Sequence, residues 1–455
     1  MSNFLPNELL EKLKLQEGFD VDAFKAVHQV GERITSIRLN PKKITEPSYS
    51  NVSPVPWCEW GYYLSERPVF TVDPLYHAGC YYVQEASSMF IAHILKEIGL
   101  VNSPVRALDL CAAPGGKTTL LSSYLHHDSL LVANEVIKAR VNILQDNVTR
   151  WGEPIAVVTN NDPSAFAKLP GYFDLTLVDA PCSGSGMFRK DEGAVDEWSQ
   201  ANVNLCSDRQ KRILAESVVC LKEGGYLFYS TCSYSEQENE DILDWLISEY
   251  GFQTVQVNIN PHWGVEESIS KQHSAFGYRF YPHKVKGEGF FIGVLKKKSA
   301  QHTFERRKTK PEKSAISNEE LAQWVSVPQD LTTFLHGEDV HIFPKLYTDD
   351  LKWLQNVLYI REAGINIGRW TGRELIPSHD LALSFYINTG INKVELSLET
   401  ALKYLRKEAL MTTEFQAARK GWCLVQYKGV NLGWVKVLGN RINNYYPKSG
   451  RIMHL

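Results

Sequence analysis

Residues 107–118 read ALDLCAAPGGKT: an apolar run, then small residues with two glycines, then the polar start of a helix at Thr118. This order is typical of a strand that ends in a tight turn, where a backbone without large side chains approaches a ligand closely. The next predicted strand ends about 20 residues further on, at Glu135, whose carboxylate is placed to accept hydrogen bonds from ribose hydroxyls. The glycine spacing is neither that of a P-loop nor GxGxxG, so it predicts a nucleotide site of another Rossmann-like type.

Apolar runs separated by helical patterns continue along the chain around this stretch. They predict strands at residues 105–110, 130–134, 155–159, 175–179 and 225–230. The run 175–178 is almost continuously apolar, as in parallel strands that are buried on both faces. We therefore expect an α/β fold with a Rossmann-like sheet in a domain that spans residues 76–296.

Two further strand ends carry a cysteine in a loop of small residues. Residues 178–186 read VDAPCSGSG, which contains Asp179 and Cys182, and residues 229–233 read YSTCS, which contains Cys232. Ligands of open α/β sheets bind at the carboxyl ends of the strands, so all three loops should line one crevice. A single cysteine is more often a buried packing residue than a nucleophile. Two cysteines at neighbouring strand ends instead favour a chemical role for both.

The rest of the chain divides into three regions. Residues 1–75 combine two helical patterns with short extended pieces, one at 35–39, and predict a small α+β RNA-binding domain. Residues 297–314 are rich in Lys and Arg and predict a basic linker. Residues 315–455 show short strands and turn signals such as Lys428-Gly429, with aromatic residues that could form a stacking platform or a small core. No acidic residue follows Glu414, which favours RNA binding by this mostly β region.

Composition limits the classes of protein to consider. The net charge is −3, with 49 basic and 52 acidic residues, which argues against nonspecific coating of nucleic acid but allows local basic patches. The 8 cysteines include no C-x-x-C pair, so we expect no metal site. No apolar run reaches the ~18 residues of a membrane span, and the start lacks a signal-peptide pattern. We expect a cytoplasmic monomer without a membrane partner.

The three loop motifs together are similar to those of the RNA cytosine-C5 methyltransferases, the NOL1/NOP2/Sun family. The similarity covers residues 70–295 and includes three further segments, which read YYVQE (81–85), MFRKD (187–191) and SEQENE (235–240). Within that family the chain most resembles the bacterial RsmF (YebU) group, which modifies small-subunit ribosomal RNA. The C-terminal region resembles, more loosely, the PUA-like RNA-binding extension of the family.

This resemblance implies a class I methyltransferase domain that uses S-adenosylmethionine to methylate carbon 5 of cytidine in 16S rRNA. It implies that Cys232 is the nucleophile and that Cys182 helps to release the product. It also implies a set of residues that contact the methyl donor: Cys111, Ala112, Ala113, Pro114, Gly115, Gly116, Lys117, Glu135, Asp162 and Asp179. Two asparagines directly precede Asp162, and either could take its place.

The chemistry of the base supports the same reading. Carbon 5 of cytosine is too weak a nucleophile for a sulfonium methyl group until a thiolate adds at carbon 6 and turns the ring into an enamine. The thiolate is the reactive form, so Cys232 needs a lowered pKa or a nearby base. Asp179 is the candidate for the hydrogen bond or proton at the ring nitrogen. The target base must be flipped out or single-stranded to reach such a pocket.

Several assignments have alternatives. Arg140, Arg189 and Lys190 are candidates for RNA contact, or else solvated surface charges. The same chemistry on transfer RNA is the main alternative to ribosomal RNA. A DNA methyltransferase would use the cysteine of the Pro-Cys motif as nucleophile, which the additional Thr-Cys motif disfavours. A non-catalytic ribosome-assembly protein is disfavoured by the intact cysteine pair with Asp179.

Overall fold

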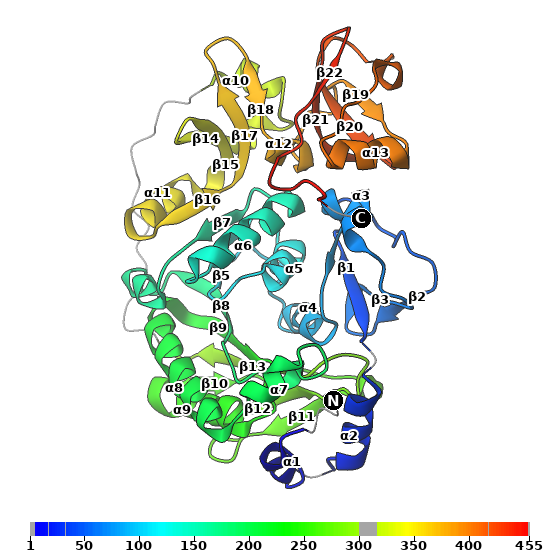
Figure 1. Ribbon diagram of the computed structural model, residues 1–455. Helices are drawn as coiled ribbons and strands as arrows, with labels where there is room; N and C mark the ends of the chain where they lie inside the picture. Colours follow the sequence, from blue (N-terminus) through cyan, green and yellow to red (C-terminus); the bar gives the residue numbers. More distant parts are fainter. Residues whose placement is uncertain (1–4, 17, 32, 300–315, 417, 454–455) are drawn as a thin grey trace.

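The computed structural model describes residues 5–453, apart from residues 17, 32, 300–315 and 417. Figure 1 shows a central sheet flanked by helices, an N-terminal unit along one side of it, and two C-terminal units at one end. Most of the predicted basic linker, residues 297–314, lies outside the described residues and stays a prediction.

The central sheet has ten strands, and its middle is parallel. The parallel strands lie in the order β9–β8–β5–β6–β7. Their bounds are β5 (Arg106–Asp109), β6 (Leu130–Asn134), β7 (Ala156–Thr159), β8 (Phe173–Asp179) and β9 (Leu221–Thr231). The chain builds outward from β5 to β7 and then crosses to β8, so β5 and β8 flank the switch point where ligands of such sheets bind.

All five predicted strands of this sheet are present. The strand at 130–134 has its predicted bounds, whereas β9 begins before Gly225, at Leu221. The pairing of β8 with β9 shifts register after Phe173, and Gly224 has a left-handed φ of 73°, so the early part of β9 is irregular. Helix α5 (Gly116–Tyr124) begins before the predicted Thr118, because Gly115 takes a left-handed φ of 111° and starts the helix.

Helices cover both faces of the central sheet. They are α4 (Phe90–Glu97), α5, α6 (Lys138–Trp151), α8 (Gln200–Ser217) and α9 (Glu240–Tyr250). The short helix α7 (Gly193–Glu197), which precedes α8, has no buried residue. Residues of α4 and α5 belong to one buried apolar layer, and residues of α8 and α9 belong to the layer on the other face. Antiparallel strands extend the sheet beyond β9: β10 (Phe252–Thr254), β11 (Glu266–Ile269), β12 (Phe276–Phe280) and β13 (Phe290–Lys297).

The N-terminal unit is a small α+β structure. Helices α1 (Asn7–Leu13) and α2 (Val21–Val30) precede a sheet in the order β2–β3–β1–β4. Its strands are β1 (Thr35–Leu39), β2 (Val52–Val55), β3 (Cys58–Leu64) and β4 (Tyr81–Val83), and the short helix α3 (Pro74–His77) precedes β4. The predicted strand at 35–39 has its predicted bounds, and β4 carries this sheet past residue 75.

The C-terminal region forms two four-stranded sheets. The first holds β14 (Leu331–His336), β15 (Asp339–Pro344), β17 (Ile365–Trp370) and β18 (Leu375–Pro377), with helices α10 (Asn318–Ala322), α11 (Thr348–Val357) and α12 (His379–Leu383). The second holds β19 (Lys393–Glu395), β20 (Gly421–Tyr427), β21 (Val430–Val437) and β22 (Ile442–Asn444), with helix α13 (Leu398–Leu405).

Two local features of this region bear on the predictions. Lys428 and Gly429 both have positive φ and join β20 to β21, which confirms the predicted turn. Strand β16 (Ile360–Ala363) lies between β15 and β17 in the chain but belongs to the central sheet, where it pairs antiparallel with β7 at the edge. Within the described ranges, no helix combines the length and apolar character needed to cross a bilayer.

Candidate active site

The loops after β8 and β9 bring the two predicted cysteines into contact. Sγ of Cys182 lies 2.9 Å from Sγ of Cys232, and both thiols are free. The hydrogen bond with Cys232, followed by burial, raises the pKa of the Cys182 thiol well above its ordinary value. Cys182 therefore keeps its proton at neutral pH and can donate it in a hydrogen bond to the sulfur of Cys232.

A buried carboxylate holds these two loops together. Glu238 accepts a hydrogen bond from the backbone N–H of Ser183 at 2.7 Å, and others from the hydroxyls of Ser183 and Ser233 at 2.6 and 2.5 Å. Each serine directly follows one of the two cysteines. Burial raises the pKa of Glu238, although the hydrogen bonds from the serines oppose this shift. Because both loops converge on one side chain, Glu238 fixes the separation of the thiols.

The sequence did not single out Glu238 as a site residue. Its segment, residues 235–240, is marked only by family resemblance, because a run of acidic residues normally lies in solvent. The signal that could have found it is the serine beside each cysteine, since hydroxyls buried at neighbouring strand ends need a common acceptor. Asn239 adds to the same arrangement, accepting from Thr231 Oγ1 at 2.6 Å and donating to the carbonyl of Ser233 at 2.8 Å.

Asp179 lies at the end of β8 and forms an ion pair with Lys117. Its Oδ2 is 2.7 Å from Nζ of Lys117, and its Oδ1 accepts a hydrogen bond from the hydroxyl of Ser230 at 2.8 Å. Burial works against the charge of Lys117, but attraction to Asp179, and more weakly to Cys232, raises its pKa overall. Lys117 therefore stays charged, and it lies near both Asp179 and Cys232.

The turn after β5 is surrounded by carboxylates. Asp109 is fully buried and accepts a hydrogen bond from Thr118 Oγ1 at 2.7 Å, and burial raises the pKa of Asp109 to about 7. Burial raises the pKa of the Cys111 thiol, and the carboxylates of Asp109, Asp179 and Glu135 raise it further. Three carboxylates therefore border the predicted donor-binding turn, residues 111–117, and two of them are paired with the cations Lys117 and Arg140.

Glu135 lies at the end of β6, beside this turn. Its side chain is 3% exposed, and its Oε1 accepts a hydrogen bond from the backbone of Ile137 at 2.8 Å. Its Oε2 is 3.4 Å from Nη1 of Arg140, whose Nη2 donates to the carbonyl of Ala113 at 2.6 Å. Arg140, predicted as an RNA contact or a surface charge, is thus placed against the donor-binding turn.

Asp162 is exposed at the start of the short helix η3 (Pro163–Lys168). It accepts hydrogen bonds from the hydroxyl and the backbone N–H of Ser164, at 2.7 and 3.1 Å, and these bonds lower the pKa of Asp162. The neighbouring Asn160 donates to the carbonyl of Glu135 at 2.6 Å. The chain after β7 therefore borders the Glu135 side of the crevice.

The other two basic candidates lie around Glu288, just before β13. Arg189 is buried, with Nη1 donating to the carbonyl of Gly287 at 3.3 Å and Nε 3.7 Å from Oε2 of Glu288. Lys190 is partly exposed, and its charge acts on the same carboxylate. Arg189 is therefore not a solvated surface charge, while Lys190 remains accessible.

These residues fit a nucleoside ligand. The Glu135 carboxylate has acceptor capacity left for ribose hydroxyls, and the carboxylates of Asp109 and Asp179 lie on the other side of the turn. Gly116 keeps the start of α5 free of a side chain, since a Cβ there would lie 3.3 Å from Cε1 of Tyr82. The side chains present are compatible with S-adenosylmethionine as the ligand of this turn.

Family models match three parts of the chain. The model described as 16S rRNA methyltransferase RsmB/F matches residues 101–296. The N-terminal domain of 16S rRNA methyltransferase RsmF matches residues 5–86, and the methyltransferase RsmF PUA domain matches residues 391–452. The last match covers the second C-terminal sheet only.

Whole-length relatives and solved structures agree with these matches. The chain is 30% identical to ribosomal RNA small subunit methyltransferase F of Vibrio vulnificus (strain YJ016) and 31% identical to that of Vibrio parahaemolyticus serotype O3:K6. Both alignments cover 98% of this chain and 97% of the relative. A methyltransferase homolog from Pyrococcus horikoshii is 26% identical, with a TM-score of 0.51 over 64% of this chain and 100% of that one. NSun6 from the same organism, solved with SFG, shares the fold at 20% identity and a TM-score of 0.53, over 65% and 98%. S-adenosylmethionine is the methyl donor of this fold.

Proposed function

Because the chain belongs to the RsmF family of 16S rRNA methyltransferases, we propose that it methylates carbon 5 of cytidine in 16S rRNA, with Cys232 as the nucleophile. The observation that carries this proposal is the contact of two thiols at 2.9 Å, beside the ion pair of Lys117 with Asp179. Methylation of a nitrogen or an oxygen needs no thiol. A ring carbon that must first be activated by nucleophilic addition does need one.

Cys232 begins the reaction as a thiolate. Its sulfur bonds to carbon 6 of the cytosine, and the electrons of the C5–C6 double bond make carbon 5 nucleophilic. S-adenosylmethionine, when bound, supplies the methyl group as an electrophile. Carbon 5 then carries the new methyl group together with its original proton.

Asp179 holds the base during the addition. Its carboxylate can accept a hydrogen bond from the exocyclic amino group, which holds the base in place for the addition. Lys117 and Ser230 bind the two oxygens of this carboxylate and fix its orientation. The residues around the base are thus arranged before it arrives, so little reorganisation is needed during the reaction.

Cys182 assists the release of the product. The proton on carbon 5 leaves to water, its bonding electrons re-form the C5–C6 double bond, and the C6–S bond breaks with its electrons on Cys232. The thiol of Cys182 keeps its proton and lies against that sulfur, so it can stabilise the departing thiolate by a hydrogen bond. Without Cys182 this step should be the slow one.

Among the basic candidates, we propose Lys190 as a contact to the RNA. Arg140 instead holds the donor-binding turn, and Arg189 holds Glu288, so both act by positioning the loops. The second C-terminal unit, which matches the PUA model and has no acidic residue after Glu414, is the further surface proposed for RNA.

Bisulfite sequencing of 16S rRNA and transfer RNA from cells with and without the protein tests this function. We expect at least one cytidine of 16S rRNA to lose protection in cells that lack the protein. The wild-type gene should restore protection, and a gene that carries Cys232→Ala should not. If cytidines lose protection only in transfer RNA, transfer RNA is the substrate instead. If protection is unchanged in both RNAs, the proposed chemistry is contradicted.

A further inference from the structure

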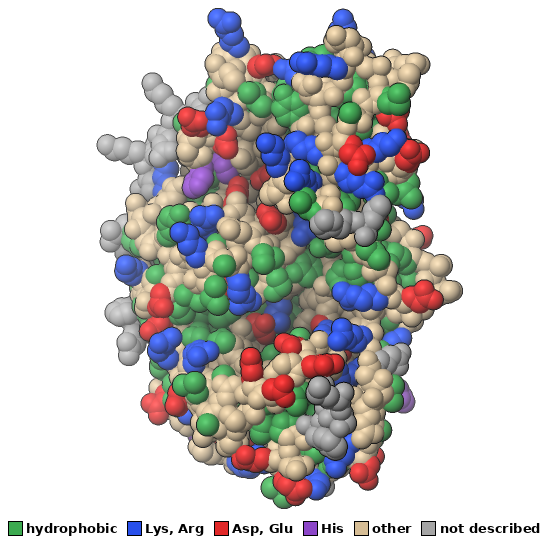
Figure 2. Space-filling model, in the orientation of Figure 1, with side chains coloured by type: hydrophobic (Ala, Val, Ile, Leu, Met, Phe, Trp, Pro, Cys, Tyr) green, Lys and Arg blue, Asp and Glu red, His purple; other side chains and the backbone are tan. Residues whose placement is uncertain are grey.

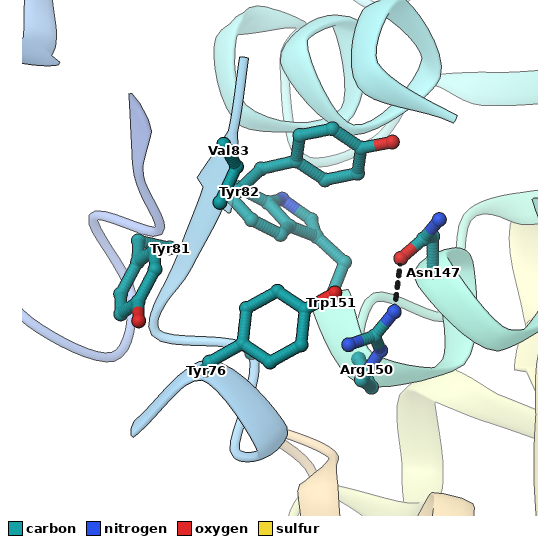
Figure 3. Close-up of a pocket in the computed structure, with 8 residues that line it drawn as sticks. Tyr76, Tyr81, Tyr82, Val83, Asn147, Arg150 and Trp151 are labelled. Carbon is teal, nitrogen blue, oxygen red and sulfur yellow. Dashed lines mark hydrogen bonds between the residues drawn. The ribbon is translucent and has the colours of Figure 1, made fainter. Parts of the chain in front are cut away.

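An aromatic pocket lies between the N-terminal unit and helix α6, away from the two thiols. Its volume is about 100 Å³, and its wall includes Tyr76, Gly79, Tyr82, Asn147, Arg150 and Trp151. Figure 3 shows the rings of Tyr76, Tyr82 and Trp151 gathered together, with Arg150 and Asn147 beside them on α6. Nothing in the proposed reaction uses these side chains.

Backbone contacts fix the shape of this pocket. Gly79 has a left-handed φ of 67°, and a Cβ there would lie only 1.9 Å from the carbonyl oxygen of Arg150. Only glycine therefore allows these two segments of the backbone to lie this close together. The guanidinium carbon of Arg150 lies 4.8 Å from the ring centre of Tyr76, and the side chain also donates a hydrogen bond to Asn147. The pocket is therefore a built feature with a cation held over an aromatic ring.

The pocket shares a wall with the donor-binding turn. Nδ2 of Asn147 donates to the carbonyl of Pro114 at 2.7 Å. On the other side of that turn, the ring of Tyr82 borders Gly116, where a Cβ would lie 3.3 Å from it. The pocket is therefore separated from the crevice only by the loop at residues 114–116.

The second C-terminal unit reaches the same place. His77, which directly follows Tyr76 in α3, shares a hydrogen bond of 3.1 Å with the hydroxyl of Tyr446. Lys407 donates to the carbonyl of Tyr446. Figure 2 shows Lys and Arg side chains gathered above the central hollow of the molecule, where the C-terminal units meet the rest. Positive charge thus borders the pocket on the side of the unit that matches the PUA model.

We propose that this pocket holds a nucleobase of the RNA substrate that flanks the target cytidine. The inference rests on the proposed function, because it requires RNA in the crevice. Aromatic rings and an arginine plane can stack on any base. When the target base flips out, its neighbour loses a stacking partner, and the pocket replaces that partner with protein rings.

Equilibrium binding of a labelled RNA tests the pocket without any need for methylation. The probe is a single-stranded dodecamer of uridines with one central cytidine, and the readout is fluorescence anisotropy at fixed salt. Tyr76→Ala should raise the dissociation constant about 5- to 150-fold, the range for loss of one base–aromatic stack. Tyr76→Phe keeps the ring and should stay within about twofold of wild type. Tyr250→Ala, at the end of α9, is the matched aromatic control and should change nothing.

A second probe, in which abasic nucleotides replace the flanking uridines, measures how much the flanking bases contribute to the affinity. Wild type should bind it as weakly as Tyr76→Ala binds the intact dodecamer, and Tyr76→Ala should bind both probes equally. If Tyr76→Ala lowers the melting temperature of the protein, Arg150→Met is the second variant with which to test the pocket. Equal binding of the intact dodecamer by wild type and both variants would overturn the proposal. Variants that lose affinity for S-adenosylmethionine but keep their affinity for the dodecamer would also overturn it. Failure of the proposed function would show only in the sequencing experiment, so the two failures are distinguishable.

Discussion

The sulfur atoms of Cys182 and Cys232 lie 2.9 Å apart, although 50 positions separate these residues in the chain. Strands β8 and β9 are parallel neighbours in which Asp179 pairs with Ser230, so both cysteines leave the sheet at the same height. The hydrogen bond between the thiols and burial keep the proton on Cys182. The two cysteines are therefore chemically unequal, and removal of one should not resemble removal of the other.

Cys182→Ala should trap the enzyme on its product. Cys232 can still add to carbon 6 and methyl transfer can still occur, but the departing thiolate loses its hydrogen-bond donor. We expect a slower-migrating protein band on a denaturing gel, which disappears after digestion with ribonuclease.

The double variant Cys182→Ala with Cys232→Ala is the control and should give no band. Cys232→Ala alone should lose methyl transfer while S-adenosylmethionine still binds. A trapped band in Cys232→Ala, together with none in Cys182→Ala, would reverse the roles of the two cysteines.

Glu238→Ala should slow methyl transfer by up to about 100-fold, because a small misplacement of reacting groups has effects of that size. The loops that carry the two cysteines would lose their common acceptor, while the donor-binding turn is untouched. Calorimetry should therefore give an unchanged affinity for S-adenosylmethionine. Glu238→Gln keeps an acceptor for the N–H of Ser183 and should recover most of the rate. Equal losses in both variants, or weakened donor binding, would show that Glu238 acts on general stability instead.

Gly116→Val should weaken the binding of S-adenosylmethionine. Its side chain would meet the ring of Tyr82, which a Cβ already approaches to 3.3 Å, and would crowd the start of α5. Overpacking of this kind costs enough to raise the dissociation constant roughly tenfold or more. Gly193→Val, at the exposed start of α7, is the matched control. An unchanged calorimetric affinity in Gly116→Val would place the donor elsewhere.

Asp380→Asn should stabilise the protein at alkaline pH. Burial raises the pKa of Asp380 to about 7, and burial together with Asp380 raises the pKa of Glu362 to about 8. The folded protein thus holds protons that the unfolded chain releases near pH 4, so stability falls as pH rises from there toward 8.

The variant lacks the charge at position 380, so its gain in stability over wild type should be larger at pH 8.5 than at pH 5, by up to roughly 3 kcal/mol. Urea unfolding at the two pH values measures this difference. The exposed Glu223→Gln should show no such dependence on pH. A gain of equal size at both pH values would attribute the effect to packing, not to titration.

Local sequence patterns were sufficient to locate the strands of the central sheet and the three loops of the candidate site. The five strands of the parallel sheet, the turn at residues 111–117 and the two cysteine loops follow from apolar runs and small residues that are adjacent in sequence. Parallel strands buried on both faces must be apolar throughout, so such runs are visible without any knowledge of their partners. Because ligands bind at the carboxyl ends of such strands, the same patterns predicted that the three loops line one crevice.

Contacts between distant segments were decided only by the tertiary structure. Glu238 lies in an acidic run that sequence places in solvent, yet it is buried because two serine hydroxyls and an N–H converge on it. Strand β16 joins the central sheet from the C-terminal region, and Asp350 of the preceding helix α11 pairs with Arg106 of β5 at 2.8 Å. A strand pattern states that a segment needs partners but not which ones, because backbone hydrogen bonds are the same for every sequence. A buried charge, in turn, is tolerated only where folding supplies its partners, so its place cannot be read from neighbouring residues.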